Sequence, residues 1–229
     1  MPFRDRRDAG ARLAAALAHY SMERPVVLAL PRGGVPVAAV IATALAAPLD
    51  LILVRKIGVP FHKELAMGAV VDGGPPTIVR NHDVIAMAGI TEEAFQSVCD
   101  AELGEIERRR HAYVGERAPV TVAGRTVIVV DDGLATGATM KAALRALKMR
   151  APQRLVMAVP VAPPDTLAAM RPEADDIVCL EAPAAFDAIG AFYEDFRQVS
   201  DRQVIALLAA CGTGPEGTPH TPPQTASED

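Results

Sequence analysis

Residues 127–139 of this chain read Val-Ile-Val-Val-Asp-Asp-Gly-Leu-Ala-Thr-Gly-Ala-Thr. The four β-branched apolar residues predict a buried strand, and Asp131 and Asp132 stand where that strand ends. A turn of small and hydroxyl-bearing residues follows and leads into a helix. Ligands of open α/β sheets bind beyond the carboxyl ends of the strands, and the N–H groups at a helix start favour an anion. The segment therefore offers an anion site beside two carboxylates, which together suit a sugar phosphate.

This segment resembles the phosphoribosyl pyrophosphate (PRPP) motif of type I phosphoribosyltransferases, in which two acidic residues and a Thr-Gly-centred loop follow an apolar strand. The resemblance implies that Asp131 and Asp132 bind the 2- and 3-hydroxyls of the ribose. It implies a loop that binds the 5-phosphate, formed by Ala135, Thr136, Gly137, Ala138 and Thr139. The alternative is an ordinary strand–turn–helix unit with two solvated carboxylates.

The segment departs from the family pattern at two positions. Ala138 stands where many members have a second glycine, so its backbone must tolerate a Cβ, as the first turn of a helix would. Ala135 stands where the 6-oxopurine enzymes carry an aspartate that acts on the purine, whereas the adenine enzymes have alanine. The resemblance therefore leaves adenine, pyrimidines or another heterocycle as the acceptor.

The rest of the chain alternates between strand and helix patterns. Alternation of this kind predicts a twisted, mainly parallel sheet with helices on both faces, an α/β fold. Strands are expected at 26–30, 51–54, 126–130, 154–159 and 176–180, and helices at 10–20, 35–46, 91–113, 140–149, 164–170 and 200–210. We expect one domain over residues 1–211 and a disordered tail over 212–229, which is rich in Gly, Pro, Thr and Glu.

Two short segments lie where the resemblance places a pyrophosphate site. The first is Pro31-Arg32-Gly33-Gly34, whose two glycines let the backbone approach a ligand closely. Alone, this segment is equally typical of a tight turn between a strand and a helix. The second is Arg55-Lys56, which is expected to end the strand 51–54 and to stabilise negative charge on a leaving group. Its alternative is a solvated charge pair.

Residues 57–90 contain many glycines and prolines and predict a mobile loop or insert that closes over the reacting atoms. Within it, Glu64 is a candidate base, although a solvated carboxylate is the simpler interpretation, and His62 is not expected to bind a metal. Residues 183–199 are expected to form a hood over the acceptor base, with Asp187, Tyr193 and Phe196 as base-binding candidates. The alternative for these aromatic residues is an anchor that docks the final helix.

Composition excludes several classes of protein. The net charge of −5 argues against binding nucleic acid by phosphate neutralisation. Cys99, Cys179 and Cys211 lack metal-ligand spacing and suggest reduced thiols in the cytoplasm. Residues 1–8 mix charges without an apolar stretch, so no signal peptide is expected. The uncharged run 33–49 is too short to cross a membrane, so we expect a soluble protein.

These observations predict a phosphoribosyltransferase that moves ribose 5-phosphate from PRPP to a nitrogenous base and releases pyrophosphate. The resemblance implies Mg²⁺ held mainly through PRPP, with no protein metal cage. Its partners are then PRPP and a heterocyclic base, and residues 91–113 could carry a homodimer interface. A PRPP- or nucleotide-sensing regulator on the same fold is the main alternative. A receiver domain lacks its central aspartate here, and a nucleotide hydrolase lacks a P-loop lysine.

Overall fold

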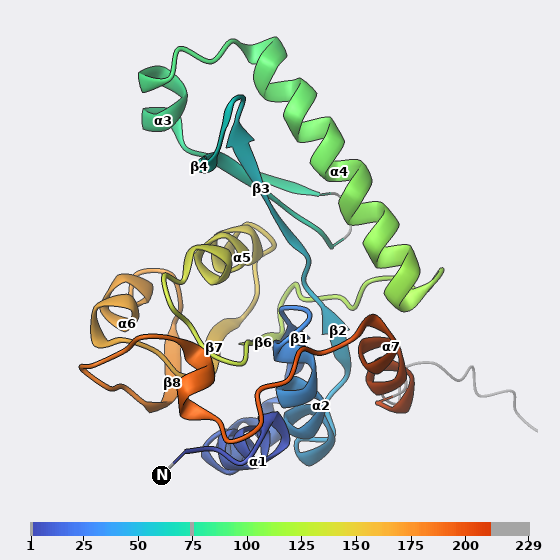
Figure 1. The fold of residues 1–229 in the computed structure, drawn as a ribbon. Helices are drawn as coiled ribbons and strands as arrows, with labels where there is room; N and C mark the ends of the chain where they lie inside the picture. The colour runs from blue at the N-terminus through green and yellow to red at the C-terminus, as the bar shows by residue number, and fades with distance from the viewer. Residues whose placement is uncertain (1, 74–75, 212–229) are drawn as a thin grey trace, which may run out of the picture.

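The computed structural model describes residues 2–73 and 76–211. These residues form two sheets (Figure 1), one parallel and five-stranded and the other antiparallel and three-stranded. The strand order is β2-β1-β6-β7-β8 in the parallel sheet and β3-β4-β5 in the antiparallel sheet. The expected tail over 212–229 lies outside the described residues.

Four of the five strands of the parallel sheet, all but β2, agree closely with their predictions. The sheet consists of β1 (Val26–Ala29), β2 (Leu49–Leu51), β6 (Thr126–Val130), β7 (Arg154–Val161) and β8 (Asp176–Glu181). Every residue of β1 and β6 is buried, as expected for strands covered on both faces. Because β1 and β6 are neighbours in parallel register, the loops after them leave the sheet side by side.

Helices cover both faces of this sheet. Alternate residues of each strand face opposite sides, and both sets are apolar, so both faces need to be covered. Val27, Ala29, Ile128 and Val130 belong to one apolar cluster with α1 (Arg6–Ala16), α2 (Gly34–Ala44) and α7 (Asp201–Ala210). Val26, Leu28, Val127 and Val129 belong to the other, with α5 (Ala138–Lys148) and α6 (Pro164–Met170). The predicted fold class is confirmed by this arrangement.

The first helix differs from its prediction. It begins at Arg6 rather than near residue 10, because Asp5 caps it by accepting the N–H groups of Arg7 and Asp8. It ends at Ala16, and a 3₁₀ helix follows at Ala18–Glu23. A second 3₁₀ helix occupies Ile189–Phe192.

Residues 57–90, expected to form a mobile loop or insert, contain most of the antiparallel sheet. The strand predicted at 51–54 is misplaced: β2 ends at Leu51, and β3 (Val54–Val59) begins the second sheet. It pairs with β4 (His62–Val71), which pairs with β5 (Thr77–Arg80). Register shifts beside Gly58 accommodate the glycine that obscured this hairpin in the sequence.

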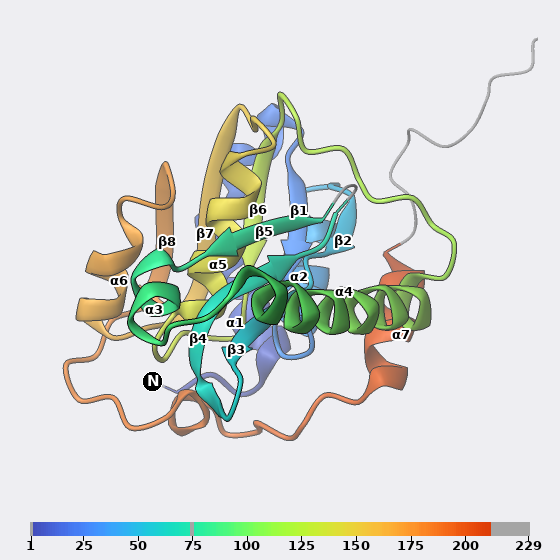
Figure 2. The same ribbon diagram turned by 90° about the horizontal axis from the view of Figure 1, so that it is seen from above.

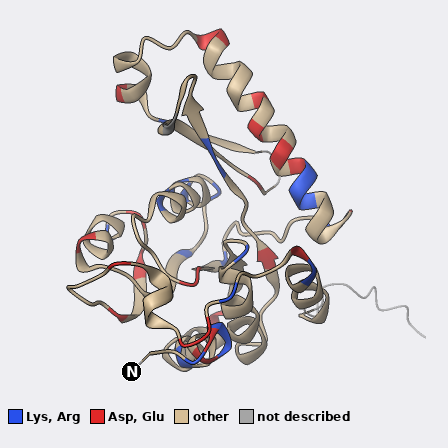
Figure 3. Cartoon of the chain, in the orientation of Figure 1, with Lys and Arg blue, Asp and Glu red and all other residues tan. Residues whose placement is uncertain are grey.

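Two helices follow the antiparallel sheet in the chain: α3 (His82–Met87) and α4 (Glu92–Val114). The Thr91 hydroxyl caps α4 by accepting the N–H of Ala94. In α4, acidic residues dominate the beginning and arginines gather near the end (Figure 3), which suits the helix dipole. Figure 2 shows α4 lying across the antiparallel sheet, and the tip of the β3–β4 hairpin reaching toward the side of the molecule along which residues 183–199 run.

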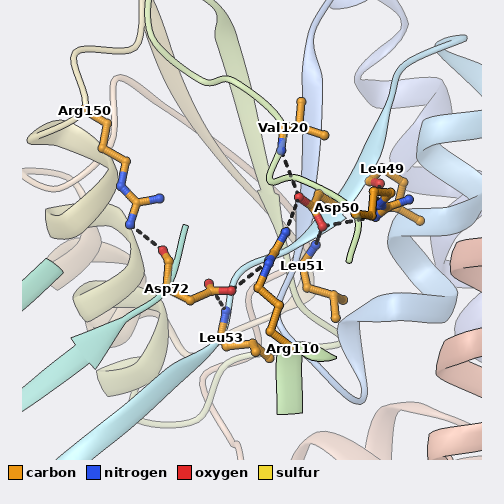
Figure 4. Close-up of polar contacts among 9 residues, drawn as sticks. Leu49, Asp50, Leu51, Leu53, Asp72, Arg110, Val120 and Arg150 are labelled. Atoms are coloured by element: carbon orange, nitrogen blue, oxygen red, sulfur yellow. Dashed lines mark hydrogen bonds and ion pairs between the residues drawn. The ribbon is translucent and has the colours of Figure 1, made fainter. Parts of the chain in front are cut away.

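A buried group of charges joins the two sheets (Figure 4). Arg110 of α4 donates to Asp50 Oδ2 at 2.9 Å and to Asp72 Oδ2 at 2.8 Å. The side chains of Asp50 and Asp72 are only 2% and 4% exposed. Arg117 also donates to Asp50, and Arg150 donates to the carbonyl of Asp72. We call this group the Asp50–Arg110–Asp72 joint.

Candidate functional site

Two loops meet at the carboxyl edge of the parallel sheet. One follows β1 and contains residues 31–34, and the other follows β6 and contains residues 131–137. The N–H of Leu30 donates to the carbonyl of Val130 at 2.9 Å, which ties their beginnings together. The peptide bond between Pro31 and Arg32 is cis. The structure thus places the PRGG segment directly beside the acidic pair.

The loop expected to bind the 5-phosphate ends at the start of α5. Gly137 is the N-cap of this helix with φ of 70°, and no side chain caps the helix. The first-turn N–H groups of α5 are therefore available to an anion. The Thr166 hydroxyl donates to the carbonyl of Ala135 at 2.6 Å, which supports the loop from below. Ala138 is the first helical residue, so its Cβ is tolerated, as the sequence suggested.

The side chains of this loop are open to solvent where a ligand would need them. Those of Ala135, Thr136, Ala138 and Thr139 are exposed. Gly137 itself has no room for a side chain, because a Cβ there would lie 3.0 Å from Thr166 Cγ2 and φ is positive. The loop therefore combines an accessible rim with a fixed backbone, which is what recognition of a phosphate by backbone amides requires.

The two carboxylates of the acidic pair have different surroundings. Asp132 is 7% exposed, and its Oδ2 accepts a hydrogen bond from Arg6 Nε at 2.7 Å. Asp131 is partly exposed as a residue, but its carboxyl is buried, and its Oδ1 accepts the N–H of Asp132 at 2.9 Å. Burial, and then the neighbouring Asp132 carboxylate, raise the pKa of Asp131 well above its ordinary value. The pair is thus one fixed carboxylate beside one that readily holds a proton.

Gly33 is required by its distance from this pair. A Cβ at Gly33 would lie 2.1 Å from Asp132 Oδ2, closer than any real contact. The backbone of the PRGG segment therefore packs directly against the carboxylate, and the glycine is needed for close approach rather than for positive φ. Gly34 meets the carbonyl of Val130 in the same way, at 2.6 Å from its ideal Cβ.

Arg32 points to a partner that the sequence did not suggest. Its Nη1 lies 3.5 Å from Asp201 Oδ1, at the start of α7. The Tyr113 hydroxyl donates to the same carboxylate oxygen at 2.7 Å. That hydrogen bond holds the pKa of Asp201 below its ordinary value, and the charge of Arg32 adds to the effect. The Arg32 side chain is therefore directed toward the start of α7, where Asp201 also accepts the Tyr113 hydroxyl.

Arg55 and Lys56 are separated by the strand that carries them. Consecutive residues of a strand face opposite sides, and β3 is a strand at this point rather than the end of one. Arg55 Nε donates to Glu102 Oε2 of α4 at 2.6 Å, so Arg55 faces α4. Lys56 is exposed and shares its face with Val54, which packs in the cluster of α5. Lys56, and not Arg55, therefore lies on the side of β3 that faces residues 135–139, which we call the phosphate loop.

The residues proposed to bind a base are not gathered into one surface. Asp187 is exposed, but Tyr193 is buried, and its hydroxyl donates to the carbonyl of Asp132 at 2.7 Å. Burial, and then the charge of Asp132, raise the pKa of Tyr193. The Phe196 ring lies 4.9 Å from the Tyr193 ring and 3.9 Å from the Arg6 guanidinium carbon. Tyr193 and Phe196 are thus packed around the acidic pair, and their stacking on a base stays a prediction.

These aromatic residues anchor residues 183–199, which we call the hood segment, to the N-terminus rather than to the final helix. The Phe3 ring lies 5.3 Å from that of Tyr193, and the two residues form an isolated bridge. The N–H of Phe3 donates to the carbonyl of Phe192, and the N–H of Glu194 donates to that of Phe3. Arg6, next to this bridge, is the site residue that sequence reasoning missed, because no local pattern links it to a carboxylate 126 residues away.

The described residues contain no group of three or more His, Cys, Asp or Glu side chains that could hold a metal ion. A hard cation at this edge would take most of its oxygen ligands from a phosphorylated substrate and from water, as Mg²⁺ commonly does. Within 2–73 and 76–211, no helix has the length and apolar character needed to traverse a bilayer.

Comparison with known proteins agrees with this geometry. Residues 5–196 match the family model described as phosphoribosyl transferase domain. Two Mycobacterium tuberculosis proteins provisionally named phosphoribosyl transferases, MT0597 and Rv0571c, are each 45% identical over 206 residues. The match covers 90% of this chain and 46% of each relative, so the chain spans about half the length of these curated relatives.

A solved structure is similar over nearly the whole chain. The crystal structure of TT1426 from Thermus thermophilus is 41% identical, with a TM-score of 0.81. The match covers 93% of this chain and all of TT1426. The resemblance inferred from residues 127–139 is thereby confirmed: the chain belongs to the phosphoribosyl transferase domain family.

Proposed function

We propose that this protein transfers ribose 5-phosphate from PRPP to a nitrogen of a heterocyclic base, in the presence of Mg²⁺, and releases pyrophosphate. The observation that carries the proposal is the uncapped start of α5 beside Asp131 and Asp132. An anion site and two sugar-binding carboxylates at one sheet edge suit a phosphorylated pentose. Membership of the family supports the class of reaction.

Each part of the site has a distinct task in this proposal. The N–H groups of residues 135–139 hold the 5-phosphate, while Asp131 and Asp132 orient the ribose through its hydroxyls. The C1–O bond to pyrophosphate breaks as the base nitrogen bonds to C1, and the carboxylates stabilise the positive charge that develops on the ring. Mg²⁺ bound to the pyrophosphate oxygens would offset the charge of the leaving group.

Cationic side chains of the chain complete this stabilisation. Arg32 lies in the PRGG segment beside Asp132, and Lys56 lies on the face of β3 turned toward α5. We propose that the side chains of these two residues stabilise the negative charge of the departing pyrophosphate. Arg55, which the sequence also suggested, is engaged by Glu102 on the other face. Ala135 offers no group that could take a proton from the base, which supports an acceptor outside the 6-oxopurines.

A regulatory protein that senses PRPP is the second candidate, and one observation favours it. The aromatic residues expected to stack on a base are used to hold the hood segment and the acidic pair. Binding of PRPP needs only the phosphate loop and the carboxylates, so it could occur without transfer. The free thiols of Cys99, Cys179 and Cys211 support a cytoplasmic location for either function.

The test combines binding with turnover. Calorimetric titration with PRPP and Mg²⁺ measures binding, and a coupled assay with a panel of purine and pyrimidine bases measures released pyrophosphate. Binding with release for at least one base supports the transferase, and binding without release for any base supports the sensor. If the titration with PRPP detects no binding, both the transferase and the sensor are contradicted.

A further inference from the structure

Three groups around the acidic pair contact the guanidinium of Arg6. Its Nε donates to Asp132 Oδ2 at 2.7 Å, and its Nη1 donates to the carbonyl of Arg197 at 2.9 Å. Its Cζ lies 3.9 Å from the centre of the Phe196 ring. Both partners of the ion pair are 11% exposed. Removing two charges from water costs free energy unless the hydrogen-bond geometry compensates. The Nε–Oδ2 distance of 2.7 Å provides that geometry, so the ion pair is fixed in place.

Asp132 is confined from three directions as a result. Arg6 lies against its Oδ2, the backbone of Gly33 lies against the same oxygen, and the Tyr193 hydroxyl holds its carbonyl. Asp131 differs, because the Asp132 carboxylate affects its protonation more strongly than the charge of Arg6 does. Two adjacent carboxylates that share one cation cannot both be charged at low cost, so a proton falls to the member that the cation does not contact.

We propose that Arg6 is a positioning residue, which holds the Asp132 carboxylate in the orientation that the sugar hydroxyls require. Arg6 acts through Asp132 and does not touch the substrate. The inference rests on the proposed function, because it concerns the carboxylates assigned there to the ribose.

The other charged groups around the pair do not replace Arg6. Tyr193 faces it from the hood segment but is neutral, since its pKa is raised by burial. Arg32 comes from the PRGG segment, where it lies 3.5 Å from Asp201. Residues 135–139 of the phosphate loop carry no charge. Arg6 is thus the cation that α1 supplies to Asp132.

Arg6 also separates the pair from an open space. A cavity of about 650 Å³ lies between α1, α2, α7 and the end of the hood segment, and its lining includes Arg6, Arg7, Arg197 and Gln203. Arg6 borders this cavity on one side and Asp132 on the other. A shorter side chain at position 6 would therefore admit water to Asp132 and free its carboxylate to turn.

The experiment compares Arg6→Gln and Arg6→Lys with the control Arg12→Gln. Arg12 lies on the same helix, pairs with Asp8 at 2.7 Å and covers the Phe3 ring at 5.0 Å, away from the acidic pair. Carbon-13 NMR titration of aspartate carboxyls follows the pair in the free protein, with Asp131→Asn to assign its signal. Calorimetry measures PRPP affinity, and thermal unfolding measures stability.

We expect Arg6→Gln to raise the titration midpoint of the pair by about one pH unit, because a cation is lost. PRPP affinity should fall about tenfold, the value of one charged hydrogen bond. Arg6→Lys should restore the midpoint, since it restores the charge, but only part of the affinity, since lysine lacks the planar fork that also reaches Arg197. Arg12→Gln should leave the midpoint and affinity unchanged.

Arg6→Gln with the midpoint and affinity of the wild type overturns the inference, whatever its melting temperature. Arg6→Lys with the same midpoint as Arg6→Gln also overturns it, because the charge would then be irrelevant. If Arg6→Gln does not fold, Arg6→Lys decides, since normal affinity in that variant contradicts a role for the planar fork. Failure of the wild type to bind PRPP contradicts the proposed function instead, while the titration in the free protein still judges Arg6.

Discussion

Asp131 and Asp132 are neighbours in sequence, yet their environments give them different protonation behaviour. In the folded protein the raised pKa of Asp131 means that it retains a proton at a pH where the unfolded chain has lost it. The unfolded carboxyl titrates near pH 4, so stability falls as pH rises from about 4 through the folded pKa, and this loss then stays constant. The acidic pair thus makes the protein less stable at neutral pH.

Asp131→Asn should consequently raise the melting temperature at pH 7 and abolish the affinity for PRPP. The gain in stability should disappear toward pH 4, where the native Asp131 is protonated and resembles the amide. Thermal unfolding between pH 4 and 8, with calorimetry at pH 7, measures both effects. A melting temperature at pH 7 below that of the wild type would contradict the environment assigned to Asp131.

Gly33→Ala tests how closely the PRGG segment approaches the pair. The added methyl would lie 2.1 Å from Asp132 Oδ2, so the carboxylate must move away from Arg6. We expect PRPP affinity to fall at least about tenfold and stability to fall by about 1–3 kcal/mol from overpacking. Calorimetry and chemical denaturation measure the two.

Gly104→Ala is the matched control for this variant. Gly104 lies within α4, and a Cβ there meets nothing within 4 Å. Replacing it should stabilise the helix by roughly 0.5–1 kcal/mol and leave PRPP affinity unchanged. Equal affinities for both glycine variants would mean that the PRGG segment does not contribute to the site.

At the scale of elements, β3 divides two basic residues between its faces. Lys56→Gln should lower kcat about a hundredfold, the typical effect of removing one group that stabilises developing charge. Arg55→Gln should instead cost at most about 1 kcal/mol of stability through its pair with Glu102, and leave kcat nearly unchanged. Steady-state kinetics with PRPP and an accepted base, together with unfolding curves, separate these outcomes. The reverse ranking of kcat would show that Arg55 serves the reaction.

Those elements that local pattern specifies could be predicted from the sequence. The strand at Thr126–Val130 is an uninterrupted β-branched run, the cap at Thr91 is a local hydrogen bond, and Ser200 forms a capping box with Gln203, three residues later. Register with a neighbouring strand then placed Gly33 beside Asp132. These features depend on residues that lie near one another in sequence or on the general rules of parallel sheets.

What could not be predicted depends on contacts between distant residues. Leu51 to Val54 forms one apolar run, yet it contains the end of β2 and the start of β3, because pairing with β4 decides where the chain changes sheets. Tyr193 is suited equally to stacking on a ligand or to packing, and its place in the sequence does not reveal the bridge to Phe3. The pairing of Arg6 with Asp132 has no local signal at all.

For the molecule as a whole, the Asp50–Arg110–Asp72 joint sets how the second sheet sits on the first. Asp50 lies in β2 and Asp72 follows β4, and Arg110 bonds both from α4. Burial raises the pKa of Asp72 despite this cation, so the joint stabilises orientation at an electrostatic cost. The position of Lys56 relative to the phosphate loop therefore depends on three charges outside the site.

Arg110→Met should destabilise the protein by about 3–5 kcal/mol, because it leaves two buried carboxylates without their shared cation. Lowering the pH should recover part of this loss as the carboxyls become protonated. The control Arg108→Gln, whose side chain is 67% exposed, should leave stability nearly unchanged. Denaturation at pH 5 and pH 7 makes the comparison, and similar losses for both variants would rule out a special role of the joint.

The contact between Phe3 and Tyr193 has a consequence for how the protein folds during its synthesis. Asp132 receives Arg6 from the beginning of the chain and the Tyr193 hydroxyl from near the end of the described part. Contacts of such wide sequence separation form late, after loop closure over most of the chain. A nascent polypeptide can therefore pair the strands of its parallel sheet before Arg6 and Tyr193 reach Asp132, so the surroundings of the acidic pair are completed after the sheet that carries it.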